Sequence, residues 1–208
     1  PFEDDLTGDI KGLRIGVPQE YFSKALAPEV RTAAEKAIED FKNLGAVITE
    51  ISLPHSAAAL SVYYILMPSE VSSNLARFDG IKYGLSINDQ QDSARETSTL
   101  LETYLDTRRY GFGREVKRRI MLGTYTLSAG YYDAYYKQAQ KVRVLIRQDF
   151  EKAFQEVDLI FSLTAPEAAF RFGAKSADPL KMYLSDMYTV TANLAGVPAI
   201  SFPIGHIE

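Results

Sequence analysis

Few residue types in this chain could do chemistry, and their scarcity narrows the possible mechanisms. The 208 residues contain no cysteine and two histidines, His55 and His206, in unrelated contexts. A thiol nucleophile, a disulfide and a thiolate metal site are therefore excluded. A histidine-built metal site and a Ser-His-Asp triad are not expected either. We predict no metal ligands in this chain.

Serine is the remaining candidate nucleophile, but its contexts are weak. The pair Ser72-Ser73 lies inside a helical pattern and Ser128 lies near a helix start, where hydroxyls usually hydrogen-bond the backbone. The chain has no S-x-x-K pair and no G-x-S-x-G, H-E-x-x-H, G-x-x-x-x-G-K-[ST] or G-x-G-x-x-G motif. The residues thus supply no catalytic group and no standard loop for ATP or a dinucleotide.

Two stretches could bind a ligand. Residues 114–119 include four cations: Arg114, Lys117, Arg118 and Arg119. Such a run usually forms a solvated helix face, whereas one guanidinium turned inward could hold a substrate carboxylate through two parallel hydrogen bonds. The tyrosine-rich stretch 125–136 is more often core and rim packing than a binding site.

Composition restricts the class of protein and its partners. With 46% hydrophobic and 24% charged residues, the chain is typical of a soluble globular protein. No stretch approaches the roughly 18 uninterrupted apolar residues of a membrane span. The net charge of −4 disfavours a surface that follows phosphates, so a nucleic acid would be held mostly by another chain.

The elements that must position these residues alternate between strands and helices. Residues 13–17 and 46–51 predict two strands, separated by an amphipathic helix over 30–44. This βαβ spacing predicts parallel strands. We predict an α/β fold with a mixed, largely parallel sheet covered by helices.

Further helical patterns cover 56–77, with a kink or restart at Pro68, then 100–110, 114–122 and 180–194. A long apolar stripe predicts a single helix from Leu127 to Phe154. Residues 157–163 and 197–203 predict strands, and the polar residues 84–98 predict a loop.

Four blocks of sequence, in the same order, resemble the amidase signature family: residues 9–18, 69–80, 111–143 and 193–199. Block 111–143 is similar to the amidase subunits of tRNA-dependent amidotransferases rather than to amidases at large. The resemblance implies that residues 1–208 form one incomplete amidase-signature domain, its C-terminal portion. A first residue of Pro1 also indicates an excised piece.

The resemblance implies a glutaminase. In that family a lysine and two serines, one of them in a Gly-Gly-Ser-Ser-Gly-Gly loop, attack the glutamine amide and form an acyl-enzyme. This chain contains no Gly-Gly dipeptide, so we expect no catalytic residue here and no activity from the fragment alone.

The resemblance also implies partners. Ammonia would pass to the B subunit of the amidotransferase, which uses ATP and magnesium to activate glutamate on tRNA(Gln), and the small C subunit would complete a heterotrimer. The expected partners are thus the B and C subunits, glutamine and, mainly through the B subunit, tRNA(Gln). We expect no cofactor in this chain and a cytoplasmic location.

By the same resemblance, three residues would bind glutamine: Tyr63 by a hydrogen bond, Arg119 through the α-carboxylate and Asp186 through the α-ammonium. A shift in register leaves Tyr64, Arg118 or Asp178 as alternatives.

Two other functions remain open at this stage. The chain could belong to a stand-alone amidase acting on small amides, or it could be a non-catalytic binding module. Block 111–143 favours the amidotransferase, and co-purification with two partner subunits would distinguish it from a stand-alone amidase.

Overall fold

The computed structural model describes residues 8–89, 99–175 and 179–206. The chain forms two compact units: unit 1 comprises residues 1–60 and 141–208, and unit 2 comprises residues 61–140. The chain leaves unit 1 within helix α2 (Ala59–Asn74) and returns to it within helix α5 (Lys137–Glu156). Both crossings between the units lie within helices, so no Pro/Gly-rich linker joins the units.

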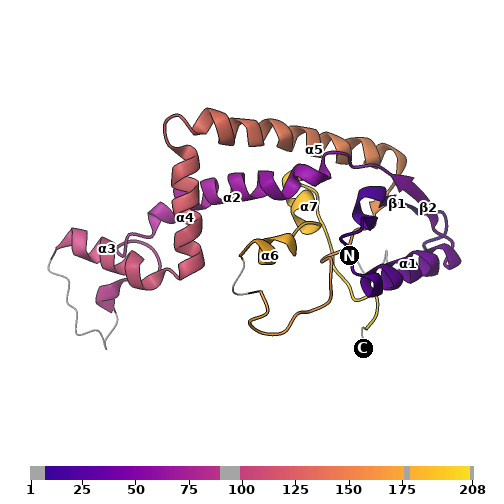
Figure 1. The fold of residues 1–208 in the computed structure, drawn as a ribbon, viewed down its shortest axis with the longest axis horizontal. Helices are drawn as coiled ribbons and strands as arrows, with labels where there is room; N and C mark the ends of the chain where they lie inside the picture. Colours follow the sequence, from indigo (N-terminus) through magenta and orange to yellow (C-terminus); the bar gives the residue numbers. More distant parts are fainter. Residues whose placement is uncertain (1–7, 90–98, 176–178, 207–208) are drawn as a thin grey trace. The chain divides into compact units, whose positions relative to one another are not determined.

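Three parallel strands form the sheet of unit 1 (Figure 1). Strand β1 (Arg14–Pro18) is central, with β2 (Val47–Ile51) on one side and β3 (Leu159–Ile160) on the other. Ile15 is in register with Ile48 of β2 and with Leu159 of β3. The predicted α/β class and the predominance of parallel strands are confirmed, and every strand pair among the described residues is parallel.

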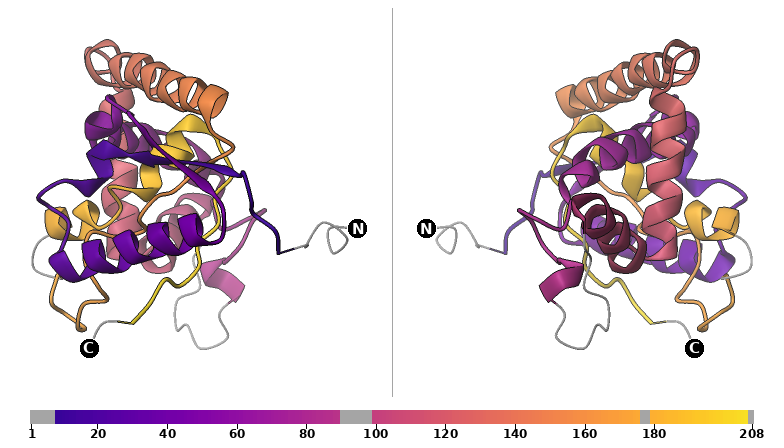
Figure 2. Two further views of the ribbon diagram at one scale, coloured as in Figure 1. Left: turned by 90° about the vertical axis from the view of Figure 1, so that its right-hand side faces the viewer. Right: turned by 90° about the vertical axis from the view of Figure 1, so that its left-hand side faces the viewer.

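Helix α1 (Pro28–Asn43) makes the crossover from β1 to β2, as predicted. Pro28 occupies the first helical turn, where a missing N–H costs nothing. Gly45 has a φ of 96°, a left-handed conformation that glycine adopts without strain, and it reverses the chain into β2. In two views, α1 lies on one side of the strands and the C-terminal part of α5 lies on the other (Figures 1 and 2).

The core of unit 1 lies around β1. If Gly16 carried a Cβ, that atom would lie 2.8 Å from Ile51 Cδ1 and 3.0 Å from Val157 Cγ2, so a larger residue would require these side chains to shift. Ile146 and Phe150 of α5 are buried in this unit, in line with the apolar stripe that predicted the helix. Parallel strands buried on both faces need such cover from helices.

Helices make up most of unit 2. Helix α2 continues through Pro68, so of the predicted kink or restart the restart is wrong. Helices α3 (Leu100–Gly111) and α4 (Arg114–Leu127) appear where predicted, and α3 begins at a reciprocal capping box between Thr99 and Glu102. Short 3₁₀ segments cover Gln19–Phe22, Ser56–Ala58, Leu75–Arg77 and Ile87–Asp89. Residues 90–98 of the predicted loop lie outside the described residues.

The predicted single helix from Leu127 to Phe154 is wrong at its start. Leu127 ends α4, and Ser128 at the C-cap is extended. Gly130, with a φ of 87°, allows the chain to turn. A one-turn π-helix (Tyr132–Tyr136) then leads into α5. The tyrosines continue the apolar period across this turn, and for that reason periodicity alone did not reveal it.

The C-terminal region also differs from the prediction. The helical pattern 180–194 is divided into α6 (Pro179–Leu184) and α7 (Thr189–Ala195), and the predicted cap Gly196 is left-handed with a φ of 76°. Strand β3 has only two residues, and 197–203 forms neither a strand nor a helix. Its backbone lacks a neighbouring strand within the described residues, and strand character requires such a partner.

A buried carboxylate ties two distant segments of unit 1 together. Asp149 on α5 accepts a hydrogen bond from the His55 backbone N–H at 2.9 Å, and His55 Nδ1 lies 3.0 Å from both of its oxygens. The sequence analysis gave His55 no partner, because Asp149 lies 94 positions away.

No helix in the described part of the chain is long and apolar enough to cross a membrane. Within the same residues, no cluster of three metal-ligating side chains is present.

An ion pair links the central strand to the residue that precedes β3, and it should make stability depend on pH. Arg14 Nη2 lies 2.6 Å from Asp158 Oδ1, and hydrogen bonds from Arg14 lower the pKa of Asp158 to about 2. An unfolded aspartate titrates near about 4, so the pair stabilises the fold above that pH and is lost as pH falls towards 2.

We therefore expect Asp158→Asn to lower the urea midpoint at pH 6 and to have little effect near pH 2. The exposed Asp40→Asn on α1 is the control, with no comparable difference between the two pH values. A midpoint difference for Asp158→Asn that is constant from pH 6 to pH 2 contradicts this role.

Candidate functional site

Arg119 is turned towards α2 and is the best-formed candidate for anion binding in unit 2. Its Nε donates to Glu115 Oε1 at 2.9 Å, and its Nη1 lies 3.3 Å from Met67 Sδ. The guanidinium carbon lies 5.6 Å from the centre of the Tyr64 ring. The side chain is 26% exposed. Of the two alternatives for the cation run, an inward guanidinium fits Arg119.

The other cations of the run point elsewhere. Arg118 is exposed and pairs with Glu115 at 3.2 Å. Lys117 Nζ donates to the backbone oxygen of Arg109. Arg114 is exposed. The run is therefore a solvated face with one inward member, and the side chain of the register alternative Arg118 is more exposed than that of Arg119.

A close helix contact places Arg119 against α2. If Gly123 carried a Cβ, that atom would lie 1.9 Å from the Pro68 carbonyl oxygen and 2.8 Å from Ser72 Cβ. Only glycine permits this approach, which lies one turn beyond Arg119 on α4. Ser72 Oγ donates to the Ser69 carbonyl, so it has the backbone-bonding role expected of a helix hydroxyl.

Tyr64 of α2 lies beside Arg119, and Tyr63 packs against Tyr64. Tyr63 and Tyr64 are both half-buried, with ring centres 5.3 Å apart in an edge-to-face arrangement. The Tyr64 ring contacts the guanidinium, and Tyr63 is reached through Tyr64. Unit 2 therefore contains Tyr63 and Arg119, two of the three residues assigned to glutamine, and the ring that contacts the Arg119 guanidinium is that of the register alternative Tyr64.

Asp186 belongs to unit 1. It lies in the turn before α7, where its carbonyl oxygen accepts from the backbone N–H groups of Thr189 and Val190 at 3.1 Å each. The side chain is half-buried. Its place beside Tyr63 and Arg119 stays a prediction, because the two units are separate bodies. The alternative Asp178 lies outside the described residues.

The tyrosine-rich stretch forms a row of exposed, mutually packed rings in unit 2. The Tyr125 and Tyr131 ring centres lie 4.2 Å apart, and Tyr131 stacks on Tyr135 at 6.0 Å. Hydrogen bonding to Tyr131 raises the pKa of Tyr125 to about 12. Tyr132 stacks on Tyr136 at 5.2 Å. These rings stabilise the turn between α4 and α5, which agrees with the expected packing role.

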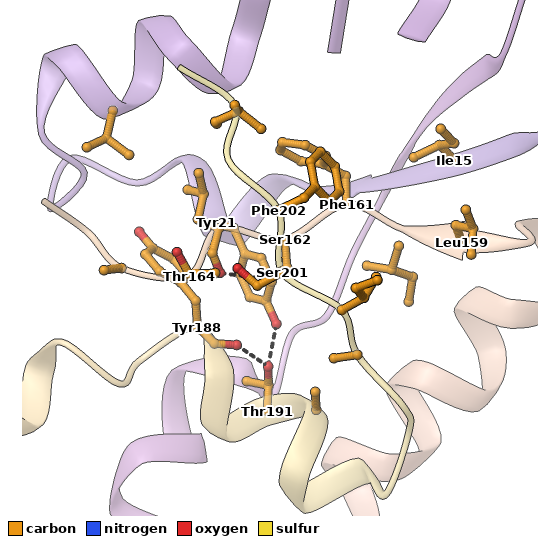
Figure 3. A pocket seen from close by; sticks show the side chains of 18 of the residues that line it. Ile15, Tyr21, Leu159, Phe161, Ser162, Thr164, Tyr188, Thr191, Ser201 and Phe202 are labelled. Carbon is orange, nitrogen blue, oxygen red and sulfur yellow. Dashed lines mark hydrogen bonds between the residues drawn. The ribbon is translucent and has the colours of Figure 1, made fainter. Parts of the chain in front are cut away.

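Unit 1 contains a large apolar hollow that the sequence analysis did not anticipate (Figure 3). Its volume is about 740 Å³. Strands β1 and β3, helices α1 and α7 and the segment 197–205 contribute to its lining, which includes Ile15, Phe41, Phe161, Tyr188, Ile200 and Phe202. Because these residues come from segments far apart in the chain, no local pattern could have predicted the hollow.

Hydroxyl groups lie on one wall of the hollow. Thr191 Oγ1 donates to the Tyr188 carbonyl at 2.8 Å, so the Tyr21 hydroxyl, 2.7 Å from Thr191 Oγ1, must donate to it (Figure 3). Burial raises the pKa of Tyr21 to about 12, and burial also raises the pKa of Tyr188. Both phenols therefore remain hydrogen-bond donors near neutral pH.

Comparison with known proteins places this chain in one family. A family model described as Amidase matches residues 1–208, so the chain belongs to the amidase family. The resemblance inferred from the four sequence blocks is confirmed.

Relatives within the family share one name. The chain is 55% identical over 207 residues to the A subunit of glutamyl-tRNA(Gln) amidotransferase from Thermodesulfovibrio yellowstonii, and 55% identical over 204 residues to that of Acidobacterium capsulatum. These matches cover 100% and 98% of the chain but 41% of each relative. The chain therefore spans less than half the length of these relatives.

Solved structures also match the fold of this chain. The A subunit of the glutamyl-tRNA(Gln) amidotransferase from Thermotoga maritima matches with a TM-score of 0.63 and 33% identity, over 92% of this chain and 35% of that one. A bacterial aryl acylamidase matches with a TM-score of 0.67 at 15% identity, over 100% of this chain and 40% of that one, and shares the fold alone.

The close contact at Gly123 predicts that a larger side chain there would strongly lower the unfolding free energy. Replacing Gly123 with alanine would force α4 away from α2 and cost about 3 kcal/mol of unfolding free energy, as for an overpacked core. Gly113→Ala, at the N-cap of the same helix with open space around it, is the control and should cost about 1 kcal/mol or less. Urea unfolding of both variants measures the difference, and equal costs would contradict the close contact.

Proposed function

We propose that this chain is part of the glutamine-hydrolysing subunit of a glutamyl-tRNA(Gln) amidotransferase. The observation that carries the proposal is the 55% identity, across the whole chain, to relatives of that name. The Arg119 environment on α2 and α4 supports it, because a partly buried guanidinium beside tyrosine rings suits an amino-acid carboxylate.

Arg119 would bind the α-carboxylate of glutamine, Tyr63 would add a hydrogen bond and Asp186 would bind the α-ammonium. Glu115 would hold the Arg119 guanidinium in place before substrate arrives, through the 2.9 Å hydrogen bond to Nε. Because the side chain is partly buried, its interaction with a carboxylate is less screened by water than on an open surface.

The acyl-transfer step would use groups outside these 208 residues. By family resemblance, a serine oxygen attacks the amide carbon, ammonia leaves with a proton, and water then releases glutamate from the acyl-enzyme. This chain would contribute substrate binding, and a Ser-Ser-Lys set elsewhere in the polypeptide would contribute the nucleophile and its base.

The ammonia would be used by a partner. The B subunit would bind ATP, magnesium and tRNA(Gln), with the small C subunit completing a heterotrimer in the cytoplasm. The absence of a standard ATP loop in the sequence and its net charge of −4 agree with this division of labour.

A chimera tests the binding role. In it, this chain replaces the matched segment of the Thermodesulfovibrio A subunit, with the B and C subunits present. Arg119→Ala should raise KM for glutamine about 10- to 100-fold, the loss of a charge-assisted hydrogen bond, with a smaller change in kcat. The exposed Arg118→Ala is the matched control and should leave KM near that of the parent. An unchanged KM for Arg119→Ala refutes the assignment.

The whole function is tested by ammonia release. The 208-residue chain alone should release no ammonia from glutamine, whereas the chimera should do so and should co-purify with the B and C subunits. Saturable release by the chain alone contradicts the missing nucleophile. A chimera that hydrolyses small amides but not glutamine supports a stand-alone amidase, and one that hydrolyses neither supports a binding module.

A further inference from the structure

A buried donor in the hollow of unit 1 lacks a partner. Tyr188 is 2% exposed, it lines the hollow, and its hydroxyl has no hydrogen-bond partner within the described part of the chain. Its neighbour Tyr21 packs edge-to-face against it at 5.3 Å but has its own hydroxyl satisfied by Thr191. A buried hydroxyl without a hydrogen-bond partner is costly. An acceptor from outside the described residues would therefore stabilise the Tyr188 hydroxyl.

The apolar wall of the hollow is also only partly covered. Ile200 is 88% exposed and Phe202 is 53% exposed, on a segment that forms no strand. The Phe202 ring contacts Phe41 of α1 at 6.3 Å, so one side of this segment is anchored in unit 1. Its backbone and outer apolar side chains are what a further strand or loop would cover.

The charge of the lining restricts the occupant. Within the described residues, no lysine, arginine or histidine lines the hollow, and Glu167 is its one charged member. Lys175, outside this lining, pairs with Glu167, so among the described residues the lining offers an anion no cation of its own. The acceptor that suits the Tyr188 hydroxyl is therefore an uncharged carbonyl oxygen on an apolar group.

The relatives indicate where that group comes from. The region matched by this chain is 41% of the Thermodesulfovibrio and Acidobacterium subunits, so most of their polypeptide lies outside it. We propose that the hollow is the docking site for that outside polypeptide, and that the Tyr188 hydroxyl donates a hydrogen bond to a main-chain carbonyl of the docked segment. Docking of this kind does not depend on which amide the complete enzyme hydrolyses.

Association of two co-expressed pieces tests the proposal. One piece is this chain, and the other is the tagged remainder of the Thermodesulfovibrio A subunit. The two should co-purify, and Tyr188→Phe should weaken their association about tenfold, since it removes one hydrogen bond and no apolar surface. Tyr132→Phe, an exposed hydroxyl of unit 2, is the matched control and should leave the affinity unchanged. Ile200→Asp, on the exposed apolar segment, should abolish association.

A dye distinguishes the proposed occupant from a small molecule. The dye 1-anilinonaphthalene-8-sulfonate should fluoresce with this chain and lose that signal in the intact chimera, where polypeptide fills the hollow. Undiminished dye binding in a folded chimera indicates an open ligand pocket and overturns the proposal. Parent-like affinity for Tyr188→Phe, or failure of the two pieces to co-purify when the chimera is folded, overturns it as well.

Discussion

The structure of unit 1 depends on one constraint, that a parallel strand buried on both faces needs a strand on each side and helices above and below. Strand β1 meets it with β2, β3, α1 and α5. Gly16 allows Ile51 and Val157 to close over the strand. The hollow lies against β1 and β3, where the apolar cover of the sheet is incomplete.

The packing of unit 2 also depends on a glycine, Gly123, that allows a close contact. The approach of Gly123 to Pro68 fixes α4 against α2, and that packing turns one cation of an otherwise solvated run inward. Arg119 thereby gains Glu115, Met67 and Tyr64 as neighbours, whereas Arg118 stays on the surface. Substrate recognition in this chain would rest on the helix packing more than on the charge run itself.

The two features suggest a division of labour in an amidase-family protein. Unit 2 offers an arginine and tyrosines suited to an amino acid, and unit 1 offers a sheet, a buried phenol and an uncovered apolar wall. Within unit 1, Lys175 Nζ donates to Ser185 Oγ at 2.8 Å and also pairs with Glu167. The chain spans 41% of the Thermodesulfovibrio relative that it matches.

The sequence by itself determined the βαβ start, the parallel strands, most helix positions and the family, because local periodicity, caps and ordered motifs are properties of neighbouring residues. It misjudged the helix start at Leu127 and the strand over 197–203, because turns hidden within a continuous apolar period and strand partners are not local. Only the tertiary structure decided which arginine turns inward, that His55 meets Asp149, and that the hydroxyl of Tyr188 is buried without an acceptor among the described residues. Each of these depends on contacts between segments that are distant in the chain, which spacing along the sequence does not encode.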